Sequence, residues 1–563
     1  MRQGGVNVLK RQQSFQDTSR DEPIWKLCRS LMGTDVERVL LPELKLSDEK
    51  LSQVLKIFSE QKQGDLAFAT LEEVRTDGNI KLKASHYTLG IASCARSNMT
   101  PQALKLLEVM PQAKVQPNLY SYSAAISACE KGRQWQRALM LFVGMPQAHI
   151  QPTVISYNAA ISACEKGGQW QRAFKLFEAM PKASVQPDVF SYNATISACE
   201  KGGQWQRALK LLAAMRLTQV QPGVMSYNAT ISACEKGWQW QHALKLFEVV
   251  PQETLQPNVI SYNAVISACE KGGQWQRALM LFKGMLQAKV QPTVISYNAA
   301  ISACEKGGPW QQALNLFQAM HLGRVKPNVI SCSAVISACE KGGQWQKALK
   351  LFEEMPQAAV HPNVISCNAA ISACEKGGQW HRALNLLQGM SEAKVQQTVV
   401  SYNATISSCE KAGQWQQALK LFEAMPRANV QPDVISYSAA ISACEKAGQW
   451  EQAMKLFEAM SLMEVQPNVI SYNASISACE DGGQWRQALD LFEAMPKAKL
   501  QRDVISYDAA MSACEEGGQW QLCMWLFEAM LEATIQPSHI CYSAAISTCE
   551  KAMAASTKPV EAG

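Results

Sequence analysis

Cysteine and histidine are the side chains of this 563-residue chain that could hold a metal ion or carry out redox chemistry. The chain has nineteen cysteines and seven histidines, but it has no Cys-x-x-Cys pair and its histidines show no register with the cysteines. Metal sites need such clustered ligands. Fourteen cysteines instead recur every 35 residues, from Cys94 to Cys549. A small apolar thiol repeated at one position predicts core packing in a reducing compartment.

The usual arrangements of catalytic groups are also missing from the sequence. A zinc deaminase would need His-x-Glu together with Cys-x-x-Cys, and neither motif occurs. The sequence has no glycine-rich phosphate loop, and its scattered histidines suggest no Ser/His/Asp arrangement. We therefore expect a protein that is not an enzyme, uses no metal or cofactor, and acts by binding.

Composition limits the class of partner. The chain is 47% hydrophobic and 18% charged, which excludes a wholly disordered protein. No stretch reaches the roughly 18 uncharged apolar residues of a membrane-spanning helix, so we expect no membrane partner. The formal net charge of +6 permits an anionic partner without requiring one.

An internal repeat sets the organisation of the chain. The segment from Val154 to Trp170 returns almost unchanged at Val294 and Val434. Aligned copies start at 84, 119, 154 and so on to 504, so residues 84–538 are thirteen repeats of 35 residues without insertion. The remaining segments are interpreted as an N-terminal extension (1–47), a degenerate capping repeat (48–83), a partial terminal repeat (539–553) and a disordered tail (554–563).

Each repeat is predicted to be a helical hairpin. Numbering its positions 1 to 35, a first helix should span positions 4–14, such as 157–167, where glycines end it. A second helix should start near Trp170 and end or bend at Pro181. One hairpin cannot bury its apolar face alone, so the predicted fold is all-α, a right-handed superhelical solenoid of stacked antiparallel helix-turn-helix repeats. Twelve of the fifteen tryptophans occupy position 17 and are interpreted as packing residues.

The repeat resembles the pentatricopeptide repeat (PPR) family. The resemblance rests on the 35-residue length, Val-Ile-Ser-Tyr-Asn at the start, Ala-Leu-x-Leu-Phe-x-x-Met in the second helix and Val-x-Pro-Asn/Asp at the end. It covers about four-fifths of the chain and indicates a P-type array without a C-terminal catalytic domain. The Trp-x-x-Leu-Gly-x-x-Tyr signature of tetratricopeptide repeats is missing. Two departures are Gln before the second helix and Pro after the Met of many repeats.

The resemblance implies a protein that binds single-stranded RNA, one base per repeat, in organelle RNA metabolism. It implies that positions 5 and 35 together choose the base. The base-readout candidates are Thr88, Asn118, Asn158, Asp188, Asn228, Asn258, Asn263, Asn298, Asn328, Ser333, Asn363, Asn368, Asn403, Asp433, Ser438, Asn468, Asn473 and Asp503.

The resemblance assigns two further roles. Position 2 would sandwich the base between adjacent repeats: Ile155, Phe190, Met225, Ile260, Ile295, Ile330, Ile365, Val400, Ile435 and Ile470. Position 13 would contact phosphates: Arg96, Lys131, Lys166, Lys201, Lys236, Lys271, Lys306, Lys341, Lys376, Lys411 and Lys446. Position 13 then becomes acidic at Asp481 and Glu516, so we expect weaker RNA contact there.

The residues themselves leave alternatives open at these positions. Position 35 varies among Asn, Asp, Thr, Gly and Ser while its neighbours hardly change. This favours readout of a base edge, although Asn and Asp are also ordinary turn residues. Lysine at a helix C-terminus also complements the helix dipole without any ligand.

The family's code gives a hypothetical target. With RNA running 5′ to 3′ along the chain, the thirteen repeats read A-?-U-?-Y-Y-Y-A-Y-U-A-U-?, where Y is a pyrimidine. The unassigned repeats carry Ser123 with Thr153, Asn193 with Gly223, and Asp508 with Ser538.

Localisation and mode of action follow the resemblance. The first 16 residues carry Arg2, Lys10 and Arg11 and no acidic residue, like a transit peptide, so a chloroplast or mitochondrion is expected. The chain is expected to be a monomer that changes the stability, processing or translation of a transcript, with recruited RNA-processing enzymes as further partners. The alternative is a helical-repeat protein-binding scaffold without RNA specificity, which would bind with little dependence on salt.

Overall fold

The computed structural model describes residues 48–77 and 80–556, and all of its regular elements there are helices. The chain divides into two compact parts, residues 1–272 and 273–563. The N-terminal part begins with a helix pair, α3 (Asp48–Glu60) and α4 (Gly64–Asp77). Leu51, Val54, Leu55 and Phe58 of α3 are buried on one face.

Each repeat that follows begins with a first helix. In the N-terminal part these are α5 (Ala84–Arg96), α7 (Leu119–Lys131), α9 (Val154–Lys166), α11 (Val189–Lys201), α13 (Val224–Lys236) and α15 (Val259–Lys271). In the C-terminal part they are α17 (Val294–Gly307), α19 (Val329–Lys341), α21 (Val364–Lys376), α23 (Val399–Lys411), α25 (Val434–Glu445), α27 (Val469–Asp481), α29 (Val504–Glu516) and α31 (His539–Ser556).

A second helix completes the repeat. The N-terminal part has α6 (Thr100–Gln112), α8 (Trp135–Gln147), α10 (Trp170–Lys182), α12 (Trp205–Leu217) and α14 (Trp240–Gln252). The C-terminal part has α16 (Trp275–Gln287), α18 (Trp310–Leu322), α20 (Trp345–Glu354), α22 (Trp380–Glu392), α24 (Trp415–Arg427), α26 (Trp450–Leu462), α28 (Trp485–Lys497) and α30 (Trp520–Glu532). These helices begin at position 17 as predicted.

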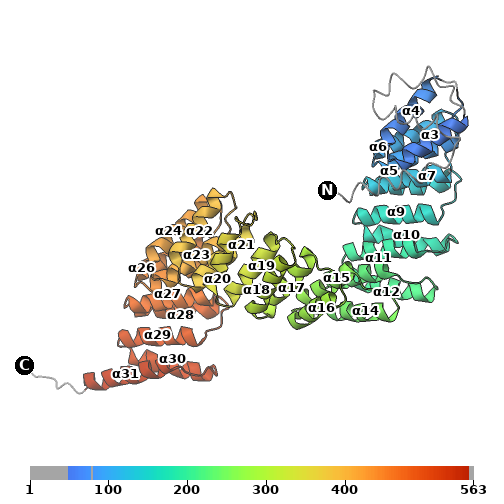
Figure 1. Ribbon diagram of the computed structural model, residues 1–563. Coiled ribbons are helices and arrows are strands. Elements are labelled where there is room, and N and C mark those ends of the chain that lie inside the picture. The colour runs from blue at the N-terminus through green and yellow to red at the C-terminus, as the bar shows by residue number, and fades with distance from the viewer. Residues whose placement is uncertain (1–47, 78–79, 557–563) are drawn as a thin grey trace, which may run out of the picture. The chain divides into compact units, whose positions relative to one another are not determined.

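Within each part the helices form two layers (Figure 1). First helices pack on one another in order, so that α7 contacts both α5 and α9. Within a part, each second helix contacts the first helices that flank it in sequence, as α8 does with α7 and α9. The stacked helix-turn-helix solenoid predicted from the repeat is confirmed.

The first helices start earlier than the sequence pattern predicted. Helix α9 begins at position 1, Val154, rather than at position 4, and ends at Lys166. The reason is a cap that spans two repeats: the residue at position 35 precedes the helix, and Ser at position 3 bonds back to it. In α11 the Ser191 N–H donates to Asp188 Oδ1 at 2.8 Å, and the Asp188 N–H donates to Ser191 Oγ at 3.2 Å. This capping box satisfies two backbone donors that would otherwise be unpaired.

The prediction that the second helix ends or bends at Pro181 misses the end of the helix by one residue. Helix α10 runs through Pro181 to Lys182, and the Pro181 carbonyl accepts a hydrogen bond from the Ser184 N–H at 3.0 Å. A proline in the last turn removes one backbone donor and leaves the rest of the helix intact. Helix α20 is the exception, because it ends at Glu354, ahead of Pro356.

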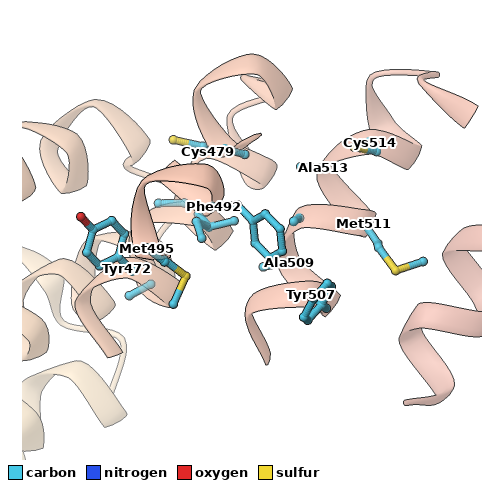
Figure 2. Close-up of a cluster of buried hydrophobic side chains, with 14 of the residues drawn as sticks. Tyr472, Cys479, Phe492, Met495, Tyr507, Ala509, Met511, Ala513 and Cys514 are labelled. Atoms are coloured by element: carbon cyan, nitrogen blue, oxygen red, sulfur yellow. The ribbon is translucent and has the colours of Figure 1, made fainter. Parts of the chain in front are cut away.

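Aromatic and sulfur-containing side chains join neighbouring repeats (Figure 2). Phe492 of α28 meets Tyr507 of α29 edge-to-face, with ring centroids 5.0 Å apart, and the same pair recurs along both parts. The cysteines at position 11 from Cys94 to Cys514 are fully buried free thiols in the same core, and burial raises the pKa of Cys164 to about 11. Core packing is confirmed for these thirteen cysteines, whereas Cys549 in the last helix is only partly buried and Cys28 lies outside the described residues.

Tryptophan at position 17 is a packing residue, as predicted. The Trp135 ring lies against Gly167 of the next repeat so closely that a Cβ there would be 2.3 Å from Trp135 Cδ1. The Arg172 guanidinium covers the ring at 4.6 Å from its centroid. The indole is therefore enclosed between repeats rather than presented for stacking on a ligand.

Two predictions concern the ends of the array. The N-terminal extension (1–47) and residues 557–563 of the predicted tail lie outside the described residues. Helix α31 continues to Ser556, three residues beyond the predicted end of the partial repeat at 553. No described helix is long and apolar enough to cross a membrane.

The turn after each first helix offers a test of backbone strain. Position 15 has a left-handed backbone, usually with Gly, such as Gly343 at φ +69°; Trp238 holds the same conformation at φ +59° and is 66% exposed. A residue with a Cβ pays about 1–2 kcal/mol there. We expect Trp238→Gly to raise the urea midpoint, and Gly343→Ala, whose Cβ would meet no atom within 4 Å, to lower it. A lower midpoint for Trp238→Gly would contradict this.

Candidate nucleic-acid interface

Positions 5 and 35 meet at the junction between successive repeats. Asn158 Nδ2 donates to Asp188 Oδ1 at 3.0 Å, joining the start of α9 to the residue that caps α11. The other joined pairs are Asn228–Asn258 (3.2 Å), Asn298–Asn328 (3.2 Å), Ser333–Asn363 (3.4 Å), Asn368–Thr398 (3.4 Å), Asn403–Asp433 (3.0 Å), Ser438–Asn468 (3.3 Å), Asn473–Asp503 (3.0 Å) and Asp508–Ser538 (2.6 Å). The structure thus brings together the two positions that the sequence assigned to one base.

Two of the predicted readout residues make other contacts. Thr88 Oγ1 donates to the Ala84 carbonyl at 2.7 Å, and Asn118 Oδ1 accepts from the Ser121 N–H at 3.0 Å. Asn263 lies on α15, the last first helix of the N-terminal part.

Serine at position 3 bonds across several junctions at which position 5 is asparagine, a contact that the sequence reasoning missed. Ser191 Oγ donates to Asn158 Oδ1 at 2.6 Å, and Ser331, Ser401, Ser436 and Ser506 repeat the contact with the position-5 asparagine before them. All of these serines are fully buried. The available signal was that position 3 is Ser in every repeat from Ser121 to Ser506.

These bonds fix which atoms face outward. Asn158 uses its carbonyl oxygen for Ser191 and one amide proton for Asp188, which leaves its second amide proton as a donor. Asp188 receives its hydrogen bonds on Oδ1, so Oδ2 remains an acceptor.

Asparagine at position 35 presents the opposite group. Asn258 Oδ1 accepts from the backbone N–H groups of Ile260 and Ser261, at 3.0 and 3.1 Å. Its Nδ2 therefore faces away from the helix as a donor. The cap orients the side chain, so Asp and Asn at this position differ in the hydrogen-bonding group they offer.

Two aspartates at position 35, Asp433 and Asp503, have a lowered pKa. Burial alone would raise the pKa of Asp433, but hydrogen bonds from the Ser436 N–H, the Asn403 amide, the Ser436 hydroxyl and the Ile435 N–H outweigh it and lower that pKa. Similar bonds lower the pKa of Asp503. At neutral pH both carboxylates can accept hydrogen bonds but cannot donate them.

Position 2 presents an apolar side chain beside every junction. Ile155, Phe190, Met225, Ile260, Ile295, Ile330, Ile365, Val400, Ile435, Ile470 and Ile505 are all exposed, from 56% at Ile435 to 73% at Phe190 and Met225. Large aliphatic side chains exposed at a fixed period are unusual on a solvated surface. Each lies two residues after the position-35 residue of the preceding repeat, so polar pairs and apolar side chains alternate along the array.

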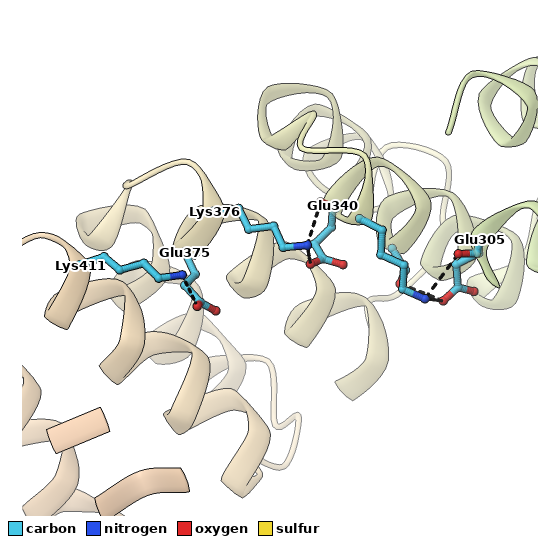
Figure 3. Close-up of polar contacts among 7 residues, drawn as sticks. Glu305, Glu340, Glu375, Lys376 and Lys411 are labelled. Carbon is cyan, nitrogen blue, oxygen red and sulfur yellow. Dashed lines mark hydrogen bonds and ion pairs between the residues drawn. The ribbon is translucent and has the colours of Figure 1, made fainter. Parts of the chain in front are cut away.

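The basic residues at position 13 are mostly paired with carboxylates. Each such lysine meets the Glu at position 12 of the preceding repeat, an arrangement termed here the Lys–Glu ladder. Its contacts are Lys166–Glu130 (2.8 Å), Lys201–Glu165 (2.5 Å), Lys236–Glu200 (2.9 Å), Lys271–Glu235 (3.0 Å), Lys341–Glu305 (3.0 Å), Lys376–Glu340 (2.7 Å), Lys411–Glu375 (2.8 Å) and Lys446–Glu410 (2.7 Å). Figure 3 shows three consecutive steps.

The ladder changes the meaning of the predicted phosphate contacts. The resemblance assigned these lysines to phosphates, but most of them already form an ion pair with a neighbouring carboxylate. The pairing was not visible at position 13 alone, because the partner lies 36 residues earlier on another helix. Phosphate contact by these lysines would have to compete with an existing ion pair.

The ladder fails where the sequence places acids at position 13. Asp481 and Glu516 stand where lysines would pair with Glu445 and Glu480. Burial raises the pKa of Glu480 to about 7, with Asp481, Glu516 and Glu445 adding to the shift and a hydrogen bond to Ser512 opposing it. Across residues 48–77 and 80–556, no group of three or more His, Cys, Asp or Glu side chains is arranged to hold a metal ion.

Comparison with known families matches most of the array. The PPR repeat family matches residues 152–201, 187–236, 257–306, 292–341, 327–374, 397–446, 432–481 and 467–514. The pentatricopeptide repeat domain matches residues 69–132 and 105–167, and a single PPR repeat matches 225–252 and 365–395. The curated proteins contain no match to this chain.

Solved structures share the fold at low sequence identity. The crystal structure of the pentatricopeptide repeat protein PPR10 from maize is 19% identical, with a TM-score of 0.54 over 92% of this chain and 85% of that one. PPR10 in complex with an 18-nt psaJ RNA element is 20% identical, with a TM-score of 0.49 over 91% and 81%. Yeast Rmd9p in complex with a 16-nt target RNA is 11% identical, with a TM-score of 0.34 over 79% and 95%. At 19% identity, the likeness to the maize PPR10 structure bears on the fold alone.

The interruption of the ladder by Asp481 and Glu516 predicts that the stability of the protein depends on pH. The folded pKa of Glu480 lies above its ordinary value of 4.5, so the folded chain binds the extra proton and stability falls as pH rises from 4.5 through about 7. At about 1.4 kcal/mol per pKa unit, Glu480→Gln should stabilise the protein above pH 7 by up to roughly 3 kcal/mol. Chemical denaturation at pH 5 and 8 measures this.

A matched variant shows whether the gain in stability comes from removing the unpaired Glu480 carboxylate or from removing any carboxylate of the ladder. Glu340→Gln removes a carboxylate that is paired with Lys376 at 2.7 Å, and it should give no stabilisation at either pH. Equal gains from Glu480→Gln and Glu340→Gln would contradict the interpretation.

Proposed function

Because the chain belongs to the pentatricopeptide repeat family, we propose that it binds single-stranded RNA sequence-specifically, one base at each repeat junction. The observation that carries the proposal is the alternation of polar pairs at positions 5 and 35 with exposed apolar side chains at position 2. A base offers two apolar faces and a polar edge, and each junction supplies groups of both kinds.

We further propose that the target is an organelle transcript in a chloroplast or mitochondrion. The resemblance of the repeats to this family supports that location. By covering a segment of the transcript, a monomer would alter RNA stability, processing or translation, directly or through recruited RNA-processing enzymes. Occupancy alone produces these effects, so no catalytic group is needed.

The Asn/Asp junctions suit uracil. At Asn403 and Asp433 the outward groups are an amide N–H donor and a carboxylate acceptor. Uracil offers the complementary edge, an N3–H donor flanked by carbonyl acceptors. Cytosine has no donor at N3, so it would leave the desolvated carboxylate unpaired at that atom, at a cost of about 1–3 kcal/mol.

The Ser/Asn junctions suit adenine. The Ser333 hydroxyl has one proton, which it donates to the Val329 carbonyl at 2.7 Å rather than to the more distant Asn363 Oδ1 at 3.4 Å, so its oxygen can accept a hydrogen bond at the junction. Asn363 is held by the Ser366 N–H at 2.9 Å and turns its amide outward as a donor. Adenine matches this pair, with an acceptor at N1 and an amino donor at N6. Thr88 and Asn118 repeat the arrangement.

The Asn/Asn junctions present donors from both residues. Asn228 and Asn258 offer amide protons, which suit the N3 and O2 acceptors of cytosine. The assignment of these junctions is thereby narrowed from either pyrimidine to cytosine.

Binding is tested with the thirteen-base RNA that the repeats specify. Fluorescence anisotropy of the whole chain should show tighter binding to A-?-U-?-Y-Y-Y-A-Y-U-A-U-? than to a scrambled RNA or the corresponding DNA. Equal affinity for target and scramble would overturn sequence-specific reading, and no binding at low salt would overturn RNA binding.

A single substitution tests the origin of the code. Asp433→Asn keeps the helix cap but replaces the outward acceptor with a donor. We expect preference at the tenth base to move from uracil to cytosine by about tenfold, since one unmatched hydrogen-bonding group costs about 1–3 kcal/mol. RNAs that differ only at the twelfth base, read by the unchanged Asn473 and Asp503, are the internal control. An unchanged preference at the tenth base would contradict the proposed geometry.

A protein-binding scaffold is the second candidate, and the Lys–Glu ladder is the observation in its favour. With most position-13 lysines neutralised, the exposed apolar side chains at position 2 could instead cover a peptide. The salt series of the same anisotropy experiment separates the two, because peptide binding depends little on salt while RNA binding follows the number of phosphates contacted.

A further inference from the structure

The first two repeats differ from the rest of the Lys–Glu ladder. Lys131 ends α7, but 36 residues before it the chain has Ala95 rather than Glu. Arg96 ends α5 and donates from Nη1 to the Ser59 carbonyl at 3.2 Å. In the part of the chain that the structure describes, neither side chain forms an ion pair with a carboxylate, and both are exposed.

Further positive charge surrounds Lys131. Burial lowers the pKa of Lys131, and Arg96, Lys166 and Lys62 add to the lowering, while Glu130 opposes it. Glu130 is already engaged by Lys166 at 2.8 Å and by the Ser162 hydroxyl at 2.8 Å. The group Lys62, Arg96 and Lys131, termed the basic cluster, therefore holds like charges near one another, and none of the three side chains forms an ion pair with a carboxylate in the described residues.

Resting on the proposed RNA binding, we propose that the basic cluster is the principal phosphate-binding site of the chain and anchors the RNA backbone at the first two repeats. An RNA phosphate supplies the anion that the cluster lacks, and the arginine can bind it through two parallel N–H groups. The paired lysines of later repeats would first have to give up a carboxylate.

The position of the cluster fits a nucleotide held at the first repeats. Thr88 lies eight residues before Arg96 on α5, and Ser123 lies eight residues before Lys131 on α7. Eight helical residues span about 12 Å, so each cation shares a helix with a readout position. Base and backbone would thus be held by the same two helices.

The test compares two double variants of the full chain in RNA titrations over a salt series. Arg96→Gln with Lys131→Gln removes the unpaired cations, and Lys376→Gln with Lys411→Gln removes two paired ones. At about −0.7 per phosphate contact, the first variant should reduce the slope of log K against log salt by roughly 1.4 and weaken binding about tenfold near 0.1 M salt. The second should leave the slope unchanged.

Neutral backbone linkages provide a second measurement on the unmodified protein. Methylphosphonate linkages at the 5′ end of the RNA should lower the slope, and the same number at the 3′ end should not. Equal effects of the two double variants, or of the two ends, would overturn the anchor while leaving RNA binding intact. Failure of the unmodified protein to bind any RNA would overturn the proposed function itself. Circular dichroism of each variant checks that the helices are retained.

Discussion

In most repeats the side chain at the last position caps the helix that follows, and the arrangement of those junctions depends on this. Asp188 and Asn258 must turn an oxygen toward the backbone N–H groups of the next helix. That requirement restricts position 35 to Asn, Asp, Ser, Thr or Gly, the residues that suit a helix N-terminus. It also decides which atom remains for a ligand, so the cap that stacks the repeats gives each junction its hydrogen-bonding character.

The sequence predicted the solenoid because one hairpin is repeated with little change, so local pattern and global fold agree. It placed the start of the first helix three residues late because Val154 and Ile155 show no helical apolar face. Ile155 is exposed, and what begins the helix is the cap formed by Thr153 and Ser156. The sequence placed the end of the second helix too early at Pro181, because the last turn of a helix tolerates a missing N–H.

The positions of the candidate interface were readable from the sequence, but their electrostatic state was not. Positions 5 and 35 stood out by variation in an otherwise constant repeat, and the hydrogen bond between Asn158 and Asp188 joins them. Lys376, by contrast, looks like a free cation until the packing of α19 against α21 brings Glu340 to it. A contact across 36 residues depends on how repeats stack, and a residue pattern within one repeat carries no such information.

An offset pairing in a linear array has an unavoidable consequence at its ends. Each ladder lysine uses the carboxylate of the repeat before it, so the first repeats have cations without carboxylates and an interruption leaves carboxylates without cations. At the first repeats, Ala95 stands 36 residues before Lys131, while Arg96 has Glu60 at that distance but donates to the Ser59 carbonyl. At the interruption, Glu516 stands opposite Glu480. In the middle of the ladder the charges balance, because each lysine there has the carboxylate of the repeat before it. A solenoid of nearly identical repeats can therefore carry an uneven charge along its length, with unpaired cations at the first repeats and unpaired carboxylates at the interruption.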